Sequence, residues 1–192
     1  LVRWWTVHPW RARGLAVVAV AVLSANLGLG MVRHGVLAPR GIDPQWNALA
    51  RWGLVAESDW PRIVRDWQAI GEWIRTETPP DSLFITPRNQ QSFKWYAQRA
   101  EVVNVKDIPQ DATSVVEWQY RRESVYPPET GALGLTGLGE PRLIALARQY
   151  GAEYIVVDEF LGKRTLSLPI VYPPATQEAA FRIYRIPVRR VT

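Results

Sequence analysis

The chain contains no cysteine and only two histidines, His8 and His34. The lack of cysteine excludes disulfide bonds, thiolate metal ligands and cysteine nucleophiles. Both histidines flank an apolar run near the N-terminus, so the rest of the chain cannot form a histidine-based catalytic triad or a zinc site built on histidine. We expect neither a bound metal nor a cofactor; a divalent cation held by Asp107, Asp158 and Glu159 is a minor alternative, because adjacent acids are far more often a solvated strand end.

Lysine is scarce as well: three lysines accompany 20 arginines, and the formal net charge is +5. Basic chains often bind nucleic acid. Here many arginines are scattered among acidic residues. The others lie near the apolar run, where anionic lipid is the simpler partner. We predict contact with a lipid bilayer and no contact with nucleic acid.

Charge is missing altogether from residues 14–32. As a helix this run would rise roughly 28 Å, close to the thickness of a bilayer's hydrocarbon core. A signal peptide is a weaker interpretation, because the run is long and no small-residue cleavage motif follows it promptly. A buried core helix is also weaker, since Ser24 and Asn26 are the only polar residues in the run. We predict a transmembrane helix over 14–32, after a flank at 1–13.

The predicted span sets the domain organisation. Residues 33–58 read as a juxtamembrane connector, and residues 59–192 are enough for one soluble α/β domain with its own core. Three arginines precede the apolar run and two follow it closely, so the positive-inside rule favours an extracytoplasmic domain. The first residue is leucine rather than methionine, and we expect further membrane spans ahead of it.

Helix and strand signals alternate through residues 59–192. Apolar side chains recur every three or four residues from Trp60 to Ile74, which predicts a helix that Pro79 and Pro80 end. Further helices are expected over 91–98, 111–123 and 141–150, and strands over 82–86, 101–105, 154–157, 168–172 and 181–186. This order predicts a small three-layer, Rossmann-like domain with about three parallel strands and a C-terminal antiparallel strand pair.

Polar residues follow the first three predicted strands. Ligands of open parallel sheets usually bind outside the carboxyl ends of the strands. We predict that one rim there binds a polar ligand, such as a sugar or a phosphate. Its residues are Arg88, Gln91, Lys94, Lys106, Asp107 and Asp158. The basic residues would bind anionic oxygens, and the aspartates would accept hydroxyls or act as a base. The alternative is that these residues cap helices, finish strands and pair with one another.

Other motifs have structural explanations. Asp111 is placed to cap the helix that follows it. The glycine-rich segment 131–139 lacks the ending of a phosphate-binding loop and is interpreted as a connection. Trp95 and Trp118 could stack on sugar rings, but their helical spacing near Phe93 favours burial in the core.

The segment 83–122 resembles the C-terminal domain of a family of large bacterial polytopic membrane proteins. The phrases that carry the resemblance are Leu-Phe-Ile-Thr-Pro-Arg, Phe-Lys-Trp-Tyr-Ala-Gln-Arg, Val-Val-Asn-Val-Lys-Asp-Ile-Pro-Gln-Asp and Val-Glu-Trp-Gln-Tyr-Arg-Arg. The earlier Trp-Ile-Arg-x-x-Thr-Pro-Pro-Asp resembles a phrase that follows the last membrane crossing of such proteins. The family is a domain of unknown function, similar in architecture to GT-C glycosyltransferases, which use lipid-linked sugars.

The resemblance covers most of residues 60–186 and implies the bacterial inner (cytoplasmic) membrane, with the domain on its periplasmic side. The catalytic acid of GT-C enzymes lies in an external loop of the membrane portion, so the resemblance assigns no catalytic residue to this chain. It favours a non-catalytic domain that supports a glycosyltransferase-like membrane protein by binding a lipid-linked sugar, another polar ligand or a partner. Two alternatives stay open: an independent enzyme that uses Asp107 and Asp158, and a pure scaffold or interaction module.

Overall fold

The computed structural model describes residues 55–128, 134–161 and 165–187. They belong to one compact unit within Gln45–Thr192. The predicted transmembrane helix over 14–32, its flank and most of the predicted connector lie outside these described ranges. Within them, no helix is both long enough and apolar enough to cross a membrane.

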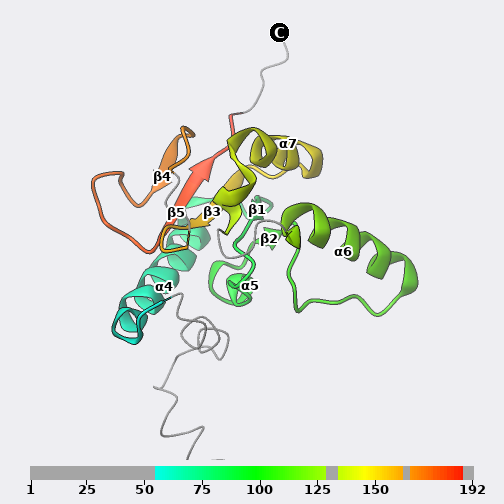
Figure 1. The fold of residues 1–192 in the computed structure, drawn as a ribbon, viewed down its shortest axis with the longest axis horizontal. Coiled ribbons are helices and arrows are strands. Elements are labelled where there is room, and N and C mark those ends of the chain that lie inside the picture. The colour runs from blue at the N-terminus through cyan, green and yellow to red at the C-terminus, as the bar shows by residue number, and fades with distance from the viewer. Residues whose placement is uncertain (1–54, 129–133, 162–164, 188–192) are drawn as a thin grey trace, which may run out of the picture. The chain divides into compact units, whose positions relative to one another are not determined.

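The described chain has a mixed α/β fold with five strands and four α-helices (Figure 1). A 3-10 turn at Glu57–Asp59 precedes the first helix, and a second at Leu135–Leu138 precedes the last. The other elements are α4 (Trp60–Glu77), β1 (Leu83–Ile85), α5 (Phe93–Ala97), β2 (Ala100–Glu101), α6 (Ala112–Val125), α7 (Glu140–Tyr150), β3 (Tyr154–Asp158), β4 (Ile170–Tyr172) and β5 (Phe181–Arg185).

The strands form one sheet in the order β2-β1-β3-β5-β4. The strands β2, β1 and β3 are parallel, whereas β5 runs antiparallel to both β3 and β4. This arrangement confirms the prediction of three parallel strands followed by an antiparallel pair. The strand β2 is shorter than expected because the chain turns at Asn104, whose Oδ1 accepts a hydrogen bond from the Lys106 amide at 2.9 Å.

Helices cover both faces of the sheet, which gives three layers (Figure 1). The helices α4 and α5 pack on one face, where the Phe84 ring lies 5.3 Å from Phe93. On the other face, Leu143 of α7 joins Ile85 and Ile155 in one buried cluster. Successive strand residues point to opposite faces, so Phe84 and Ile85 of the same strand enter different layers.

The buried face of α4 follows the predicted spacing. Trp60, Ile63, Trp67, Ile70 and Ile74 are all buried. The Trp67 ring lies 5.0 Å from the ring of Phe181, and its indole nitrogen donates to Ser92 Oγ at 3.0 Å. Asp59 directly precedes the helix but makes no capping hydrogen bond with its side chain, and Pro61 lies in the first turn.

The expected burial of Trp95 is wrong. Its side chain is 82% exposed, although Phe93 in the same helix is fully buried. The helix α5 has only five residues, and Phe93 and Ala97 occupy its inward face, four positions apart. Residue 95 falls midway between them and so lies on the opposite side of the helix.

Candidate functional site

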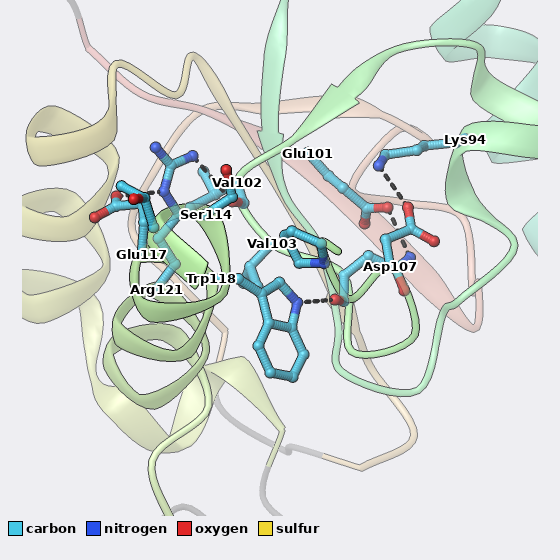
Figure 2. Close-up of a pocket in the computed structure, with 12 residues that line it drawn as sticks. Lys94, Glu101, Val102, Val103, Asp107, Ser114, Glu117, Trp118 and Arg121 are labelled. Atoms are coloured by element: carbon cyan, nitrogen blue, oxygen red, sulfur yellow. Dashed lines mark hydrogen bonds and ion pairs between the residues drawn. The ribbon is translucent and has the colours of Figure 1, made fainter. Parts of the chain in front are cut away.

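A cavity of about 450 Å³ lies between α6 and the chain that leaves β2 (Figure 2). It is termed the β2–α6 cavity below. Charged and amide side chains come from both walls. They are Lys94, Glu101, Asn104, Asp107, Glu117 and Arg121. Lys94 and Asp107 belong to the predicted rim, whereas the other four were not predicted.

The wall opposite α6 carries an ion pair between two predicted residues. Lys94 Nζ lies 2.5 Å from Asp107 Oδ2, and each side chain is about half exposed. Figure 2 shows the Lys94 amine and the Asp107 carboxylate pointing at one another, with Asp107 on the segment that follows β2. This contact joins α5 to residues 106–109, so two parts of the chain form one wall.

The α6 wall carries a second ion pair. Arg121 Nε lies 2.7 Å from Glu117 Oε1, one helical turn away. The Arg121 guanidinium also donates to the Val102 carbonyl at 3.4 Å and lies 5.5 Å from the centre of the Tyr150 ring. These contacts orient the arginine at the cavity.

The start of α6 is fixed as predicted. Asp111 Oδ1 accepts a hydrogen bond from the Ser114 amide at 2.9 Å, which caps the helix. This bond lowers the pKa of the Asp111 carboxyl. The capping explanation of Asp111 is therefore confirmed.

Glu101 is the buried carboxyl of the cavity. Its Oε2 accepts from Thr86 Oγ1 at 2.6 Å, and its Oε1 accepts from Asn104 Nδ2 at 2.8 Å. Burial raises the pKa of Glu101, and the two hydrogen bonds oppose that rise. A carboxyl held by neutral donors, at the end of β2, can either accept a hydrogen bond from a ligand or donate one when protonated.

Asn104 connects the parts of the site. Besides Glu101, its side chain donates to the Gln91 carbonyl at 3.3 Å. Its own carbonyl accepts from the Trp118 indole nitrogen at 2.7 Å, so the residue joins the β1–α5 loop to α6. Trp118 was expected in the core; it is half-buried and packs against the buried cluster that holds Ile85 and Leu143, and it also lines the cavity, where this bond orients its indole toward the chain after β2 (Figure 2).

Tyr126 is a buried residue that hydrogen-bonds to the backbone on both sides of the Thr86–Glu101 contact. Its hydroxyl lies 2.9 Å from the Thr86 carbonyl and 3.2 Å from the Val103 carbonyl. Burial raises the pKa of this phenol, so it stays protonated and donates a hydrogen bond.

We expect Tyr126→Phe to lower the free energy of unfolding by about 1–2 kcal/mol, because buried carbonyl groups lose their donor. Tyr120→Phe is the matched control, since Tyr120 is 56% exposed on α6. Chemical denaturation of the full chain measures both. Equal stability of the two variants would contradict a structural role for the Tyr126 hydroxyl.

Three further rim residues do not line the cavity. The Gln91 carbonyl contacts Asn104, as described above. Arg88 lies in the loop after β1, and Lys106 in the turn after β2, and both are exposed. The carboxyl ends of β1 and β2 are adjacent, so these residues share one end of the sheet.

Asp158 lies in a different setting. It ends β3 and is only 2% exposed, and its Oδ1 has no hydrogen-bond partner within the described chain. Gly134, with φ +60°, passes so close that a Cβ there would lie 2.5 Å from this oxygen. Burial raises the pKa of Asp158 to about 7, and the neighbouring Glu159 charge also raises it. Asp158 does not line the β2–α6 cavity, so it does not share that site with Asp107.

The unpredicted site residues had partial sequence signals. Glu101 is the one charged residue of the predicted strand over 101–105, and glutamate is rarely buried without a partner. Glu117 and Arg121 have the spacing of an ion pair on one helix face. Neither signal identified the cavity, because the closeness of α6 to β2 depends on the tertiary fold. Within the described ranges, no group of three acidic or histidine side chains is arranged to hold a metal ion.

Comparison with known proteins gives one family match. The family described as Domain of unknown function (DUF6798) matches residues 65–125, from within α4 to the end of α6. All residues that line the β2–α6 cavity fall inside this segment, whereas Asp158 lies beyond it. No curated protein and no solved structure matches the chain.

Proposed function

We propose that this domain binds a small polyhydroxylated ligand, such as the sugar of a lipid-linked glycan, in the β2–α6 cavity. The proposal rests on the two walls of this cavity, which face each other and each carry one carboxylate–cation pair. Carboxylates accept hydrogen bonds from vicinal hydroxyls, and the cations donate to hydroxyl or ring oxygens. Val102, Val103 and Pro109 add apolar surface, as polar ligands also bury C–H groups.

The charge of the cavity favours a sugar over a phosphate. It contains two cations, Lys94 and Arg121, and three carboxyl groups, Glu101, Asp107 and Glu117. Both cations are already paired with a carboxylate. Phosphate binding needs cations or amides in excess, and a second anion would be repelled here.

The domain's wider role is also part of the proposal. The uncharged residues 14–32 support membrane attachment, and the sequence resemblance supports a glycosyltransferase-like protein of the bacterial inner membrane. The domain would then be a non-catalytic part of that protein on the periplasmic side. It would hold an acceptor or a lipid-linked sugar for a reaction carried out by the membrane portion.

One observation favours the alternative of an independent enzyme. Glu101 is a buried carboxyl with a raised pKa in a cavity, which is the setting of a general acid. Turnover of a nitrophenyl glycoside by the full chain, abolished in Glu101→Gln, would support this alternative. Binding of the glycoside without turnover would support the non-catalytic function instead.

We expect Glu117→Gln to weaken sugar binding roughly tenfold, because a charged hydrogen-bond acceptor is worth about 1.5 kcal/mol or more. The full chain in detergent is titrated with methyl glycosides of glucose, mannose, galactose and N-acetylglucosamine, and with inorganic phosphate. Saturation-transfer NMR measures the affinities.

The matched control is Glu72→Gln on α4. Glu72 pairs with Arg75 at 2.6 Å on an exposed helix face, as Glu117 pairs with Arg121, but it does not line the cavity. This control should bind the same glycoside as the wild type does. Binding of inorganic phosphate alone, or equal loss in the two variants, would contradict the proposed site. A chain that binds none of these probes would favour the scaffold alternative.

A further inference from the structure

Two large apolar side chains are exposed beside basic residues at one end of the sheet. Trp95 is 82% exposed and Ile108 is 51% exposed. Arg88, Lys94 and Lys106 are exposed in the same part of the chain. These five residues are termed the Trp95 surface.

One ion pair brings the two apolar residues onto neighbouring segments. Trp95 follows Lys94 in α5, and Ile108 follows Asp107 in the turn after β2. Lys94 Nζ and Asp107 Oδ2 are 2.5 Å apart, so the two segments lie side by side (Figure 2). The Ile108 amide donates to the Lys106 carbonyl at 2.9 Å, which makes a tight turn. The side chains of Lys106 and Ile108 are both exposed on this turn.

The charge of this surface is positive. Lys94 is neutralised by Asp107. Arg88 and Lys106 form no ion pair within the described chain, so two cations remain unbalanced in the segments that also carry the exposed Trp95 and Ile108. Apart from Asp107, the nearest acids along the chain to Lys106 are Glu101, which is buried, and Asp111, which accepts a hydrogen bond from the first turn of α6.

We propose that the Trp95 surface docks on an anionic lipid bilayer. Tryptophan favours the headgroup layer, where its ring is apolar and its indole nitrogen can donate a hydrogen bond. Ile108 enters beside it, and Arg88 and Lys106 bind lipid phosphates. Lys94 belongs to this surface and also lines the β2–α6 cavity, so docking would bring that cavity to the lipid headgroups. The inference does not depend on which ligand the cavity takes.

The absence of cysteine makes a clean test possible. The full chain is reconstituted in phosphatidylcholine vesicles, with or without phosphatidylglycerol, and a fluorophore is attached to Trp95→Cys or Ile108→Cys. We expect lipids with a headgroup nitroxide to quench both probes when phosphatidylglycerol is present. Asp81→Cys is the control, because Asp81 is exposed before β1, at the opposite end of the sheet.

Charge removal tests the lipid class. The substitutions Arg88→Gln and Lys106→Gln are made together in the Ile108→Cys protein. Each lost basic residue should lower the ratio of docked to undocked domain roughly fivefold, so the pair should lower it by on the order of 25-fold. The same double substitution should leave glycoside binding unchanged, because neither residue lines the cavity. Conversely, Glu117→Gln should leave docking unchanged, so the two proposals fail separately.

Three results would overturn the docking proposal. The first is equal quenching of probes at 81 and at 95 or 108. The second is quenching that is independent of phosphatidylglycerol. The third is a disulfide between two Trp95→Cys copies in detergent without lipid, which would assign the surface to a second copy. Circular dichroism verifies that each variant keeps the native fold.

Discussion

The wild-type chain should lose stability as the pH rises from about 4 to about 8, and replacing Asp158 with asparagine should abolish most of that loss. Asp158 is 2% exposed, its Oδ1 has no hydrogen-bond partner within the described chain, and Glu159 adds a second negative charge beside it. An ionised carboxylate in this position costs desolvation free energy that no cation among the described residues offsets.

The direction of this pH dependence follows from the pKa of Asp158. Burial raises the pKa of Asp158 to about 7 from an ordinary value of 3.8. Between these values the folded chain keeps a proton that the unfolded chain has lost, so the free energy of unfolding falls as the pH rises. At about 1.4 kcal/mol per pKa unit, the loss is at most on the order of 4 kcal/mol. Below the ordinary pKa the contribution is fully present.

Guanidinium unfolding of the full chain at a series of pH values measures this effect. Asp158→Asn should flatten the profile, with a residual slope of the same sign from Glu101, whose pKa is also raised. Asp81→Asn, at an exposed position, is the control and should keep the wild-type profile. An unchanged slope in Asp158→Asn would show that the carboxyl reaches water or a counter-charge when it ionises.

Gly71→Ala should destabilise the domain by about 2–3 kcal/mol, although alanine is the better helix former. Gly71 lies on the buried face of α4. A Cβ there would lie 2.5 Å from Tyr96 Cβ and 3.2 Å from the Tyr96 carbonyl carbon. The obstacle is the base and backbone of α5 rather than a flexible side-chain end, so α4 and α5 must separate.

Thermal and chemical unfolding of the full chain test this expectation. Gln68→Ala, on the exposed face of the same helix, should change the stability by no more than a few tenths of a kcal/mol. A Gly71→Ala protein as stable as the wild type would mean that the two helices tolerate a wider spacing. The same separation would displace Lys94, which lies on α5, and so would weaken glycoside binding.

The fold was predicted best where the signal is local. The spacing of Trp60, Ile63 and Trp67 is a property of one helix, and it identified the face that packs on the sheet. Asp111 marks the start of a helix through a side-chain acceptor, which depends only on nearby residues. Local spacing misplaced Trp95, because a five-residue helix has too few positions to reveal its inward face.

The candidate site was predicted in part. The carboxyl ends of parallel strands do bring residues of separate loops together, and Lys94 meets Asp107 there. The same rule grouped Asp158 with them, but Asp158 is buried with Gly134 against its carboxyl group. The rule also passed over Glu101, Glu117 and Arg121, since it considers only residues that follow strands and says nothing of a helix beside the sheet edge.

The sequence by itself determined the mixed α/β class, the order of the helices and strands and the parallel-then-antiparallel arrangement, because these depend on periodicity, caps and connection lengths. Only the tertiary structure decided which polar groups share a cavity and which become buried. Each side chain's distance from α6, from α5 or from Gly134 is set by the packing of elements far apart in the chain. A carboxyl with the same sequence signal is therefore an exposed ion-pair partner at Asp107 and a buried group with a raised pKa at Asp158.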